Sequence, residues 1–402
     1  MNSFYHKLIA LTCLFAAFLL VQPAQAQHKT CGSDALYEKM MQEFPGAREA
    51  EEAVELEYQE YVKAPQRTAG GIRTIPVVVH IIQSSNIELV DMATVQSQID
   101  VLNEDFRKIA GSNGDGNGVD TEYEFCLATI DPNGCPTDGV NRVVHPVLAY
   151  HDQDDEVLMK GLIQWDPDNY LNMWVPRTIE TNNGLGDVIG YATFPTFLPF
   201  APNRDGVVIH SAFFGRNSNQ TYLGRTTTHE VGHWLGLFHT FQNACQGNTA
   251  NTCASNGDRV CDTPQAANAN FGCPTLNSCQ DHNGDPVDQI ENYMDYSNGN
   301  CQDMWTQGQR DRMDFHVNQY RDELTTPANQ TATGCDGTVS PGCVPQAEFV
   351  ADLTNTCVGT PVQFSDLSIG PATSWNWTFA GGTPATSTDP NPVVTYAAAG
   401  NY

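Results

Sequence analysis

Basic residues are scarce in this chain of 402 residues, which has 19 Lys and Arg against 47 Asp and Glu. The formal net charge at pH 7 is therefore 19 − 47 = −28. Proteins that bind nucleic acids by neutralising phosphates need the opposite balance, so we expect no nucleic-acid partner. Only 16% of the residues are charged and 40% are hydrophobic, which predicts a folded protein of about two domains and not a disordered one.

The chain also lacks the repeated CxxC pairs of zinc ribbons, although it has 13 cysteines. So many cysteines indicate disulfides, and hence export from a reducing compartment. One long hydrophobic run, Leu8 to Val21, follows Lys7 and precedes the small-residue pattern Ala24-Gln25-Ala26. We interpret residues 1–26 as a secretory signal peptide and not a membrane anchor. The expected product is secreted, spans no membrane, and keeps 13 − 1 = 12 cysteines after Cys13 is removed.

Local patterns predict the elements that follow. Residues 35–64 are rich in Glu and have loosely helical spacing, which predicts an exposed helix. A basic, glycine-containing stretch from Lys63 to Arg73 is typical of a protease-accessible junction. A buried strand is predicted over Thr74–Ile82, a helix over Met92–Arg107, and a further strand over Gly206–His210.

The composition changes after Leu324. Residues 325–342 are rich in Thr, Pro, Gly and Ala, which predicts a linker. Short alternating segments then predict an all-β module, with strands within Ala347–Leu353, Pro361–Phe364, Ser374–Phe379 and Val393–Tyr396. The sequence stops without a terminal element, so we expect it to be a fragment of a longer product.

The strongest chemical signal is the segment HEVGHWLGLFH, which begins at His229. On a helix, His229 and His233 project from one face one turn apart, a spacing that suits two ligands of one zinc ion. Gly236 allows the chain to leave the helix, and His239 can return as the third ligand. Three protein ligands leave a fourth position open, which is typical of a catalytic zinc site, and Glu230 is placed to take a proton from water.

Several segments resemble the pappalysin family of metzincin metallopeptidases, particularly its shorter microbial members. The resemblance covers roughly residues 70–325 and is carried by His229–Phe241, Val260–Pro264, Asn292–Ser297, Ile75–His80 and Trp165–Pro167. It implies an α/β metzincin-type fold with two lobes, in which the upper lobe holds a twisted mixed sheet and the zinc helix. The lower lobe is implied to be irregular and braced by disulfides.

The resemblance also assigns roles. It implies a zinc-dependent endopeptidase that hydrolyses protein or peptide substrates, with Glu230 as the general base. Tyr296 is implied to help hold the tetrahedral intermediate. Met294 is implied to be structural, in a tight turn beneath the zinc. Relatives that cut before Lys or Arg carry an acid just after this turn, whereas this chain reads Ser297 to Cys301 there, with Asp303 close by, so strict basic specificity is not expected.

The C-terminal segments resemble a polycystic kidney disease (PKD) domain, an immunoglobulin-like sandwich, which is incomplete here. The expected organisation is a signal peptide, a pro-segment, a metallopeptidase domain, a linker and a partial PKD-like sandwich, over residues 1–26, 27–71, 72–325, 326–345 and 346–402.

The family resemblance implies two disulfides around the methionine turn, Cys245–Cys279 and Cys273–Cys301. Cys253 with Cys261, and Cys126 with Cys135, are further candidates that would close short loops, although connectivity does not follow from sequence alone.

Cys31, followed by Gly32, resembles the pro-segment cysteine with which some relatives plug the zinc, which implies a latent precursor. The other interpretation is an ordinary disulfide cysteine. If Cys31 is free, one tail cysteine is left without a partner.

Asp258, Val260 and Thr263 lie where relatives hold a structural calcium ion, and oxygen ligands of this kind suit calcium. The alternative is a turn with solvated acids. For the whole protein, the alternative function is a non-catalytic adhesion or polymer-binding protein with a vestigial metzincin domain.

Overall fold

The computed structural model describes most of the chain, in the ranges 30–63, 71–87, 89–153, 156–180, 188–216, 219–282, 284–340, 342–343, 346–368 and 372–402. The predicted signal peptide, residues 1–26, and the centre of the predicted junction, residues 64–70, lie outside the described residues.

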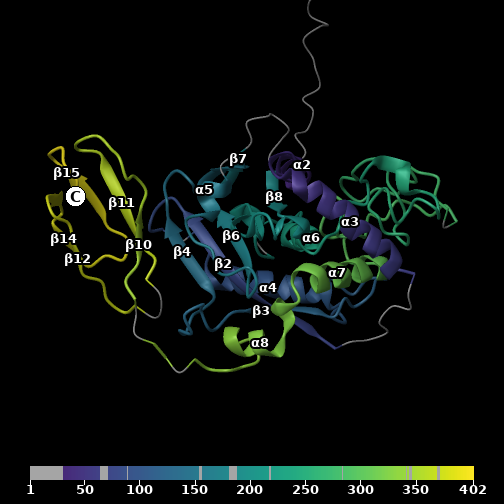
Figure 1. Ribbon diagram of the computed structural model, residues 1–402, viewed down its shortest axis with the longest axis horizontal. Coiled ribbons are helices and arrows are strands. Elements are labelled where there is room, and N and C mark those ends of the chain that lie inside the picture. Colours follow the sequence, from purple (N-terminus) through teal and green to yellow (C-terminus); the bar gives the residue numbers. More distant parts are fainter. Residues whose placement is uncertain are drawn as a thin grey trace, which may run out of the picture.

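Helices and strands are interspersed through the first two thirds of the chain (Figure 1). The helices are α2 (Ser33–Glu43), α3 (Pro45–Tyr61), α4 (Met92–Phe106), α5 (Glu156–Lys160), α6 (Arg225–Trp234), α7 (Gln307–Tyr320) and α8 (Pro327–Thr333). The strands are β1 (Thr30–Cys31), β2 (Arg73–Gln83), β3 (Tyr123–Leu127), β4 (Val140–Val144), β5 (Tyr150–Asp152), β6 (Leu171–Pro176), β7 (Thr178–Glu180), β8 (Val188–Ala192), β9 (Val207–Ile209), β10 (Phe349–Ala351), β11 (Pro361–Asp366), β12 (Trp377–Thr378), β13 (Gly382–Thr383), β14 (Thr386–Ser387) and β15 (Val393–Tyr396).

The largest sheet is a seven-stranded mixed sheet in the order β1-β8-β9-β6-β2-β3, with β4 also paired to β2. The pairs are parallel except for β8 with β9, which is antiparallel. Strand β2 reads as a continuous run of apolar and β-branched residues because both of its faces are covered. The predicted mixed sheet is confirmed, and the buried strand predicted over Thr74–Ile82 is β2.

Helix α4 covers one face of this sheet. The Asp91 side chain caps it by accepting a hydrogen bond from the Thr94 N–H at 2.8 Å. Four apolar side chains at helical spacing then enter the main core, namely Val95, Ile99, Leu102 and Phe106. The core reaches from β2 across to α6 and α7, so the sheet and the buried helix α6 form one packed unit.

The C-terminal end of α6 is fixed by a buried ion pair. Arg321, which follows α7, donates to Asp205 at 2.7 and 2.9 Å, and the Trp234 indole N–H donates to the same carboxylate at 3.0 Å. The Arg321 guanidinium also lies 3.9 Å from the centre of the Trp234 ring. Removing one partner of such a buried pair typically costs about 3–5 kcal/mol, so this contact holds the helix at a defined depth.

The N-terminal segment, residues 30–63, differs from its prediction. The expected single exposed helix is two helices, because Pro45 disfavours helical backbone at Phe44. One side of the pair is covered by the rest of the protein, and the side chains buried there are Leu36, Met40, Met41, Ala47, Val54 and Tyr58.

The segment between α6 and α7 has little regular structure and is braced by disulfides. Cys245–Cys279, Cys253–Cys261 and Cys273–Cys301 are the pairs expected from the sequence. Covalent closure stabilises a segment that few ladder hydrogen bonds hold, mainly by restricting its unfolded state.

The predicted pair Cys126–Cys135 is wrong. Cys126 bonds to Cys335 and Cys135 bonds to Cys343. The reason is that α8 returns the chain to the end of β3, where the Thr129 and Ile130 N–H groups donate to the Thr333 carbonyl at 3.0 and 3.1 Å. Part of the predicted linker is therefore helical and fastened to the sheet.

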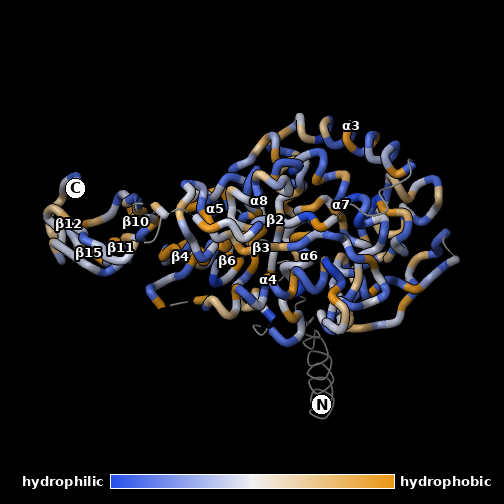
Figure 2. The backbone as a smooth tube through the Cα atoms, turned by 90° about the horizontal axis from the view of Figure 1, so that it is seen from below, coloured by the Kyte–Doolittle hydropathy of each residue, from blue (hydrophilic) through white to orange (hydrophobic). Residues whose placement is uncertain are grey.

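The C-terminal module stands at one end of the molecule (Figure 2). It contains a four-stranded sheet in the order β10-β11-β15-β13 and a two-stranded sheet of β12 and β14. The Ser365 hydroxyl donates to the Val144 carbonyl at 2.6 Å, which joins the module to the end of β4. No helix in the described ranges has the length and apolar character that a membrane crossing requires.

Candidate metal centre

Helix α6 carries the first two expected ligands and the expected base, and all of its residues are buried. It ends at a turn in which Gly236 has φ +96°, and a Cβ there would lie 2.3 Å from the His316 ring. Only glycine fits this turn without strain. The turn brings His239 back toward His229 and His233.

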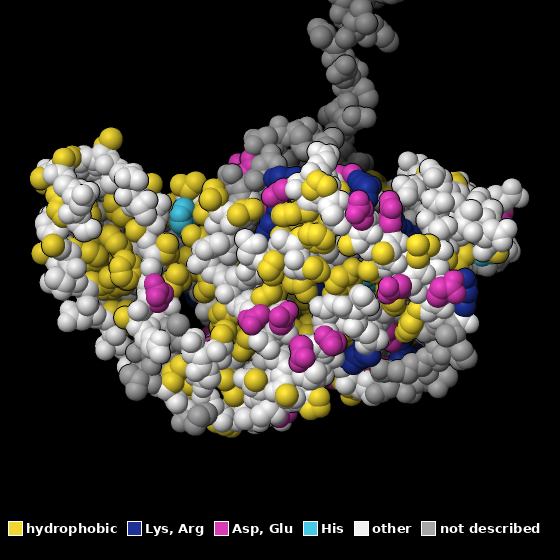
Figure 3. Space-filling model, in the orientation of Figure 1, with side chains coloured by type: hydrophobic (Ala, Val, Ile, Leu, Met, Phe, Trp, Pro, Cys, Tyr) yellow, Lys and Arg dark blue, Asp and Glu magenta, His cyan; other side chains and the backbone are white. Residues whose placement is uncertain are grey.

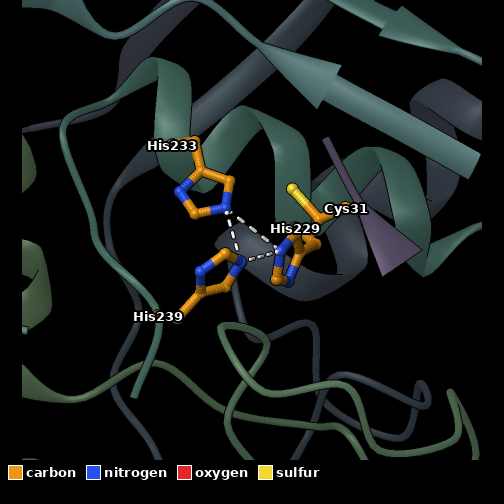
Figure 4. Close-up of side chains that lie close together, drawn as sticks. All are labelled: Cys31, His229, His233 and His239. Atoms are coloured by element: carbon orange, nitrogen blue, oxygen red, sulfur yellow. Dashed lines mark hydrogen bonds between the residues drawn. The ribbon is translucent and has the colours of Figure 1, made fainter. Parts of the chain in front are cut away.

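The three imidazoles converge on one point (Figure 4). The Nε2 atoms of His229 and His239 are 3.2 Å apart, and the Nε2 atom of His233 is 3.1 Å from each of them. The Cys31 sulfur lies in the same group, in which all four ligand atoms are within 4.8 Å of one another. The fold therefore brings the three predicted histidine ligands together with Cys31, which is distant in the sequence.

The other ring nitrogens fix the protonation of this group. His229 Nδ1 lies 2.7 Å from the Tyr293 carbonyl oxygen, and His233 Nδ1 lies 2.7 Å from that of Leu237. A carbonyl oxygen only accepts, so both Nδ1 atoms donate, and each neutral ring turns a bare Nε2 lone pair toward the other. Burial, followed by the charge of His239, lowers the pKa of His229 to about 3 and that of His233 well below its ordinary value, so these two rings stay neutral. The Asp34 carboxylate outweighs burial and raises the pKa of His239.

A cation bound between the three Nε2 atoms would remove the repulsion between their lone pairs. Three imidazole nitrogens with room for a fourth ligand suit Zn²⁺, and the backbone partners of Nδ1 orient the rings as outer-shell contacts do in zinc proteins. Burial and the nearby Glu230 carboxylate raise the pKa of the Cys31 thiol, so a bound cation is what would favour its thiolate. The residues present therefore fit a zinc ion.

Glu230 lies beside the histidines with its carboxylate directed toward the N-terminal segment. Its Oε2 accepts hydrogen bonds from the Ser33 hydroxyl at 2.8 Å and from the Cys31 thiol at 3.3 Å. Burial raises the pKa of Glu230 to about 7. The close approach of β8 depends on Gly190, where a Cβ would lie 2.9 Å from Glu230.

Tyr296 and Met294 border the histidines from the other side. The Tyr296 hydroxyl accepts a hydrogen bond from the Cys31 N–H at 3.3 Å, and its ring centre is 5.1 Å from that of His239. Met294 is fully buried against α6, since a Cβ on Gly232 would lie 2.5 Å from its sulfur. The two residues lie where the sequence patterns expected them.

The N-terminal segment runs along strand β8 and across the histidines. Strand β1 pairs in parallel with β8, and the Gly32 N–H donates to the Gly190 carbonyl at 2.8 Å. The Ser33 hydroxyl accepts from the Ala192 N–H at 2.9 Å. Asp34 lies 3.1 Å from His239 Nδ1 through its Oδ2 atom. Ser33 and Asp34 were not predicted, because no local pattern links them to residues 230 and 239.

Among the described residues, Cys31 and Cys357 are the cysteines outside disulfides. Cys31 is thus not an ordinary disulfide cysteine, and the unpaired tail cysteine is Cys357.

The three candidate calcium ligands also meet. The Thr263 hydroxyl lies 2.5 Å from Asp258 Oδ2 and 2.9 Å from the Val260 carbonyl oxygen. Burial raises the pKa of Asp258 to about 7, which marks a carboxylate without a strong cationic partner. Gln265, which was not predicted, donates to Asp258 at 2.9 Å.

A cavity opens beside Glu230 and His229, and Arg225, Asp295, Ser297 and Gln302 are among its lining residues. Asp303, which the sequence placed close by, is not among them. The two charged residues are already engaged, since Arg225 donates to the Gly299 carbonyl at 2.6 Å and Asp295 accepts from Asn270 at 2.7 and 2.9 Å.

Asp105 joins the zinc helix to the methionine turn. This buried carboxylate accepts from Arg225 at 3.0 Å, from the Thr228 hydroxyl at 2.7 Å and from the Tyr293 hydroxyl at 2.9 Å. Thr228 directly precedes His229, and the Tyr293 carbonyl orients the His229 ring. An acid beside Phe106 on the apolar face of the predicted helix was the one sequence signal that could have revealed this residue.

Comparison with known proteins agrees with this geometry. A family model described as Pregnancy-associated plasma protein-A matches residues 152–318, and a PKD domain model matches residues 347–402. An extracellular metalloprotease of Sordaria macrospora is 40% identical over 171 residues, which are 41% of this chain and 54% of that protein. Extracellular metalloprotease NCU07200 of Neurospora crassa is 35% identical over 241 residues, 57% of this chain and 78% of that protein. The structure of a mutant of Tannerella forsythia promirolysin matches with a TM-score of 0.61 and 32% identity, over 75% of this chain and 99% of that one.

We expect D105N to weaken zinc binding by about 10- to 100-fold, the range typical of lost outer-shell partners. The amide offers one acceptor oxygen to three donors and leaves the Arg225 charge unpaired. Competition with a chromophoric chelator measures the affinity.

The control is D314N, because Asp314 is also buried and accepts a tyrosine hydroxyl, that of Tyr123, at 2.9 Å. It should lower stability without changing zinc affinity. Equal zinc affinities of D105N and the unmodified protein would contradict the positioning role of Asp105.

Proposed function

Because this chain belongs to the pappalysin family of metzincin metallopeptidases, we propose that it is a secreted zinc metalloendopeptidase made as a latent precursor, with His229, His233 and His239 as zinc ligands. The observation that carries the proposal is the convergence of three imidazole Nε2 atoms beside the Glu230 carboxylate. Zinc, when bound, supplies the Lewis acid that activates water and polarises the scissile carbonyl.

The residues of the chain supply the remaining chemistry. Glu230 takes the proton of the attacking water and passes it to the leaving amine nitrogen, a transfer that its raised pKa favours. The Tyr296 hydroxyl donates a hydrogen bond to the negative charge that develops on the scissile carbonyl oxygen. Met294 packs beneath the zinc helix. Strand β8 offers its edge to an extended protein substrate once β1 leaves it.

Latency follows from the contacts of the N-terminal segment, which we assign as a pro-segment over residues 27–71. Cys31 reaches the metal position, Ser33 binds the base, and β1 occupies the edge of β8. Cleavage in the Lys63–Arg73 junction would release all three contacts, which supports activation by proteolysis. The metallopeptidase domain is then residues 72–325, and residues 326–345 connect it to the PKD-like module, residues 346–402.

A structural calcium ion at Asp258, the Val260 carbonyl and Thr263 belongs to the same proposal. Three converging oxygens, one of them on a buried carboxylate, suit this hard cation. Secretion by a signal peptide over residues 1–26 is supported by relatives named as extracellular proteases. No observation favours the adhesion alternative.

We expect E230Q to lower kcat/KM by about 10²- to 10⁴-fold, the usual contribution of a general base. Processed enzyme is incubated with a proteome-derived peptide library, with and without a zinc chelator, and the cleavage sites are read. The zinc content of E230Q should equal that of the unmodified enzyme, because the change spares the ligands. Absence of chelator-sensitive cleavage by the unmodified enzyme would contradict the proposed activity.

We expect C31A to hydrolyse a fluorogenic peptide as the intact precursor, because the metal position loses its sulfur ligand. The matched control is C357A, which removes the other free cysteine and should stay latent. Latency of C31A equal to that of the unmodified precursor would exclude the plug.

We expect saturating Ca²⁺ to raise the Tm of the zinc-loaded protein by about 5 °C, since ligand binding to the folded state adds stability. D258N should abolish this rise. The control D262N alters a neighbouring acid that instead accepts from Thr306 at 2.8 Å, and it should keep the rise. A calcium effect that survives D258N would rule out this site.

A further inference from the structure

Three phenylalanines and two arginines of the metallopeptidase domain form a patch under the pro-segment, which we call the aromatic–arginine patch. It consists of Phe194, Phe197, Phe238, Arg259 and Arg312. On the face shown in Figure 3, acidic side chains lie over helices α2 and α3, with basic side chains beside them. The two acids that bind the patch, Glu51 and Glu55, are themselves buried.

The apolar part of the patch holds Tyr37 of helix α2. Its ring meets the three phenylalanine rings edge-on, with centres 5.2 Å away for Phe194, 5.7 Å for Phe197 and 6.0 Å for Phe238. Its hydroxyl donates to Glu51 of helix α3. An aromatic side chain with an adjacent carboxylate is therefore the group that this surface accommodates.

The charged part of the patch holds Glu51 and Glu55. Arg259 lies 2.8 Å from Glu51 and 2.7 Å from Glu55, and Arg312 donates to Glu55 at 3.0 Å. Burial alone would raise the pKa of Glu55, but the charges of Arg312 and Arg259 outweigh it and lower the pKa to about 2. The two guanidinium groups are thus strong carboxylate receptors.

Both guanidinium groups also lie against Phe238, 4.8 Å from its ring centre for Arg259 and 5.2 Å for Arg312. Phe238 directly precedes the zinc ligand His239, and the Phe194 ring is 5.2 Å from that of His233. Phe194 also follows strand β8 closely in the chain. A substrate that extends along β8 past its C-terminal end would therefore reach the patch.

Removal of the pro-segment leaves this patch without its partners. Among the described residues, the ion pairs of Arg259 and Arg312 are all with Glu51 and Glu55. An apolar surface flanked by unpaired arginines is costly to expose, and such surfaces usually mark binding sites. In the precursor, the pro-segment therefore occupies a surface that suits a ligand with an aromatic group and a carboxylate.

We propose that the aromatic–arginine patch is a substrate subsite of the processed enzyme, which binds a peptide segment that carries an aromatic or large apolar side chain together with a carboxylate. The proposal rests on the proposed peptidase function and on removal of the pro-segment. It assigns a substrate preference that does not follow from the zinc-binding motif. It also gives this acidic protein a local attraction for acidic sequence.

The test compares the cleavage sites of processed variants in a proteome-derived peptide library. The unmodified enzyme should enrich Asp and Glu at one position near the cut, and R259Q should lose about tenfold in kcat/KM for those peptides, the scale of one charge-assisted hydrogen bond. Peptides without an acid should be cut within about twofold of the unmodified rate. R259E should shift the enrichment toward Lys and Arg.

Arg259 is chosen because Arg312 also donates to the Gly236 carbonyl at 2.8 Å and so supports the fold. The control is R216Q, because Arg216 has a similarly exposed side chain, 30% against 24%, and pairs with Glu104 on α4. R216Q should keep the acidic enrichment. Acidic enrichment that persists in R259Q, or its absence from the unmodified enzyme, would overturn the subsite.

A binding measurement separates this failure from failure of the peptidase function. A synthetic peptide of residues 33–61 should bind processed E230Q, and the same peptide with Glu51→Gln and Glu55→Gln should bind at least about tenfold more weakly. Equal binding of the two peptides would overturn the subsite whatever the cleavage rate. If the two peptides bind with the expected difference but the unmodified enzyme cleaves nothing, the peptidase function is contradicted. The role of the patch in binding substrate is then contradicted as well.

Discussion

The convergence of three buried imidazole Nε2 atoms, two of them on rings that stay neutral, is the constraint on which the rest of this structure depends. The backbone carbonyls of Tyr293 and Leu237 fix the proton of two rings on Nδ1, so each of these rings turns its bare Nε2 inward. A cation between the rings would relieve the repulsion of these lone pairs. The glycine turn after α6, the methionine turn and the sheet all serve to hold these rings at that separation.

The proposed pro-segment meets each part of the proposed catalytic site with a group of matching chemistry. A sulfur lies at the metal position, a hydroxyl donates to the base, and a short strand pairs with the edge of β8. Farther along, a tyrosine and two glutamates fill the aromatic–arginine patch. Inhibition is therefore distributed over several contacts, and a protease cut in the junction weakens all of them at once because they share one connection to the enzyme.

Local sequence patterns predicted the parts of the structure that depend on local chemistry. The zinc helix, the glycine turn and His239 followed from spacing alone, and strand β2 followed from its β-branched run. Contacts between distant segments could not be predicted in this way. Ser33 reaches Glu230, and Asp34 reaches His239, only through the path of the folded chain. Likewise, Cys126 pairs with Cys335 because α8 returns to the sheet, and no spacing rule contains that return.

Several of the few basic residues of this chain are used to anchor helix α6. Three buried arginines attach this helix and the turn after it to the rest of the protein, with Arg225 at its start, Arg321 on Trp234 at its end and Arg312 on the Gly236 carbonyl. Two of their counter-charges, Asp105 and Asp205, belong to the metallopeptidase domain. The third, Glu55, belongs to the pro-segment. On the proposed maturation, the first two attachments stay intact, and the charge balance changes at the third, where Arg312 lies against Phe238, the residue before His239.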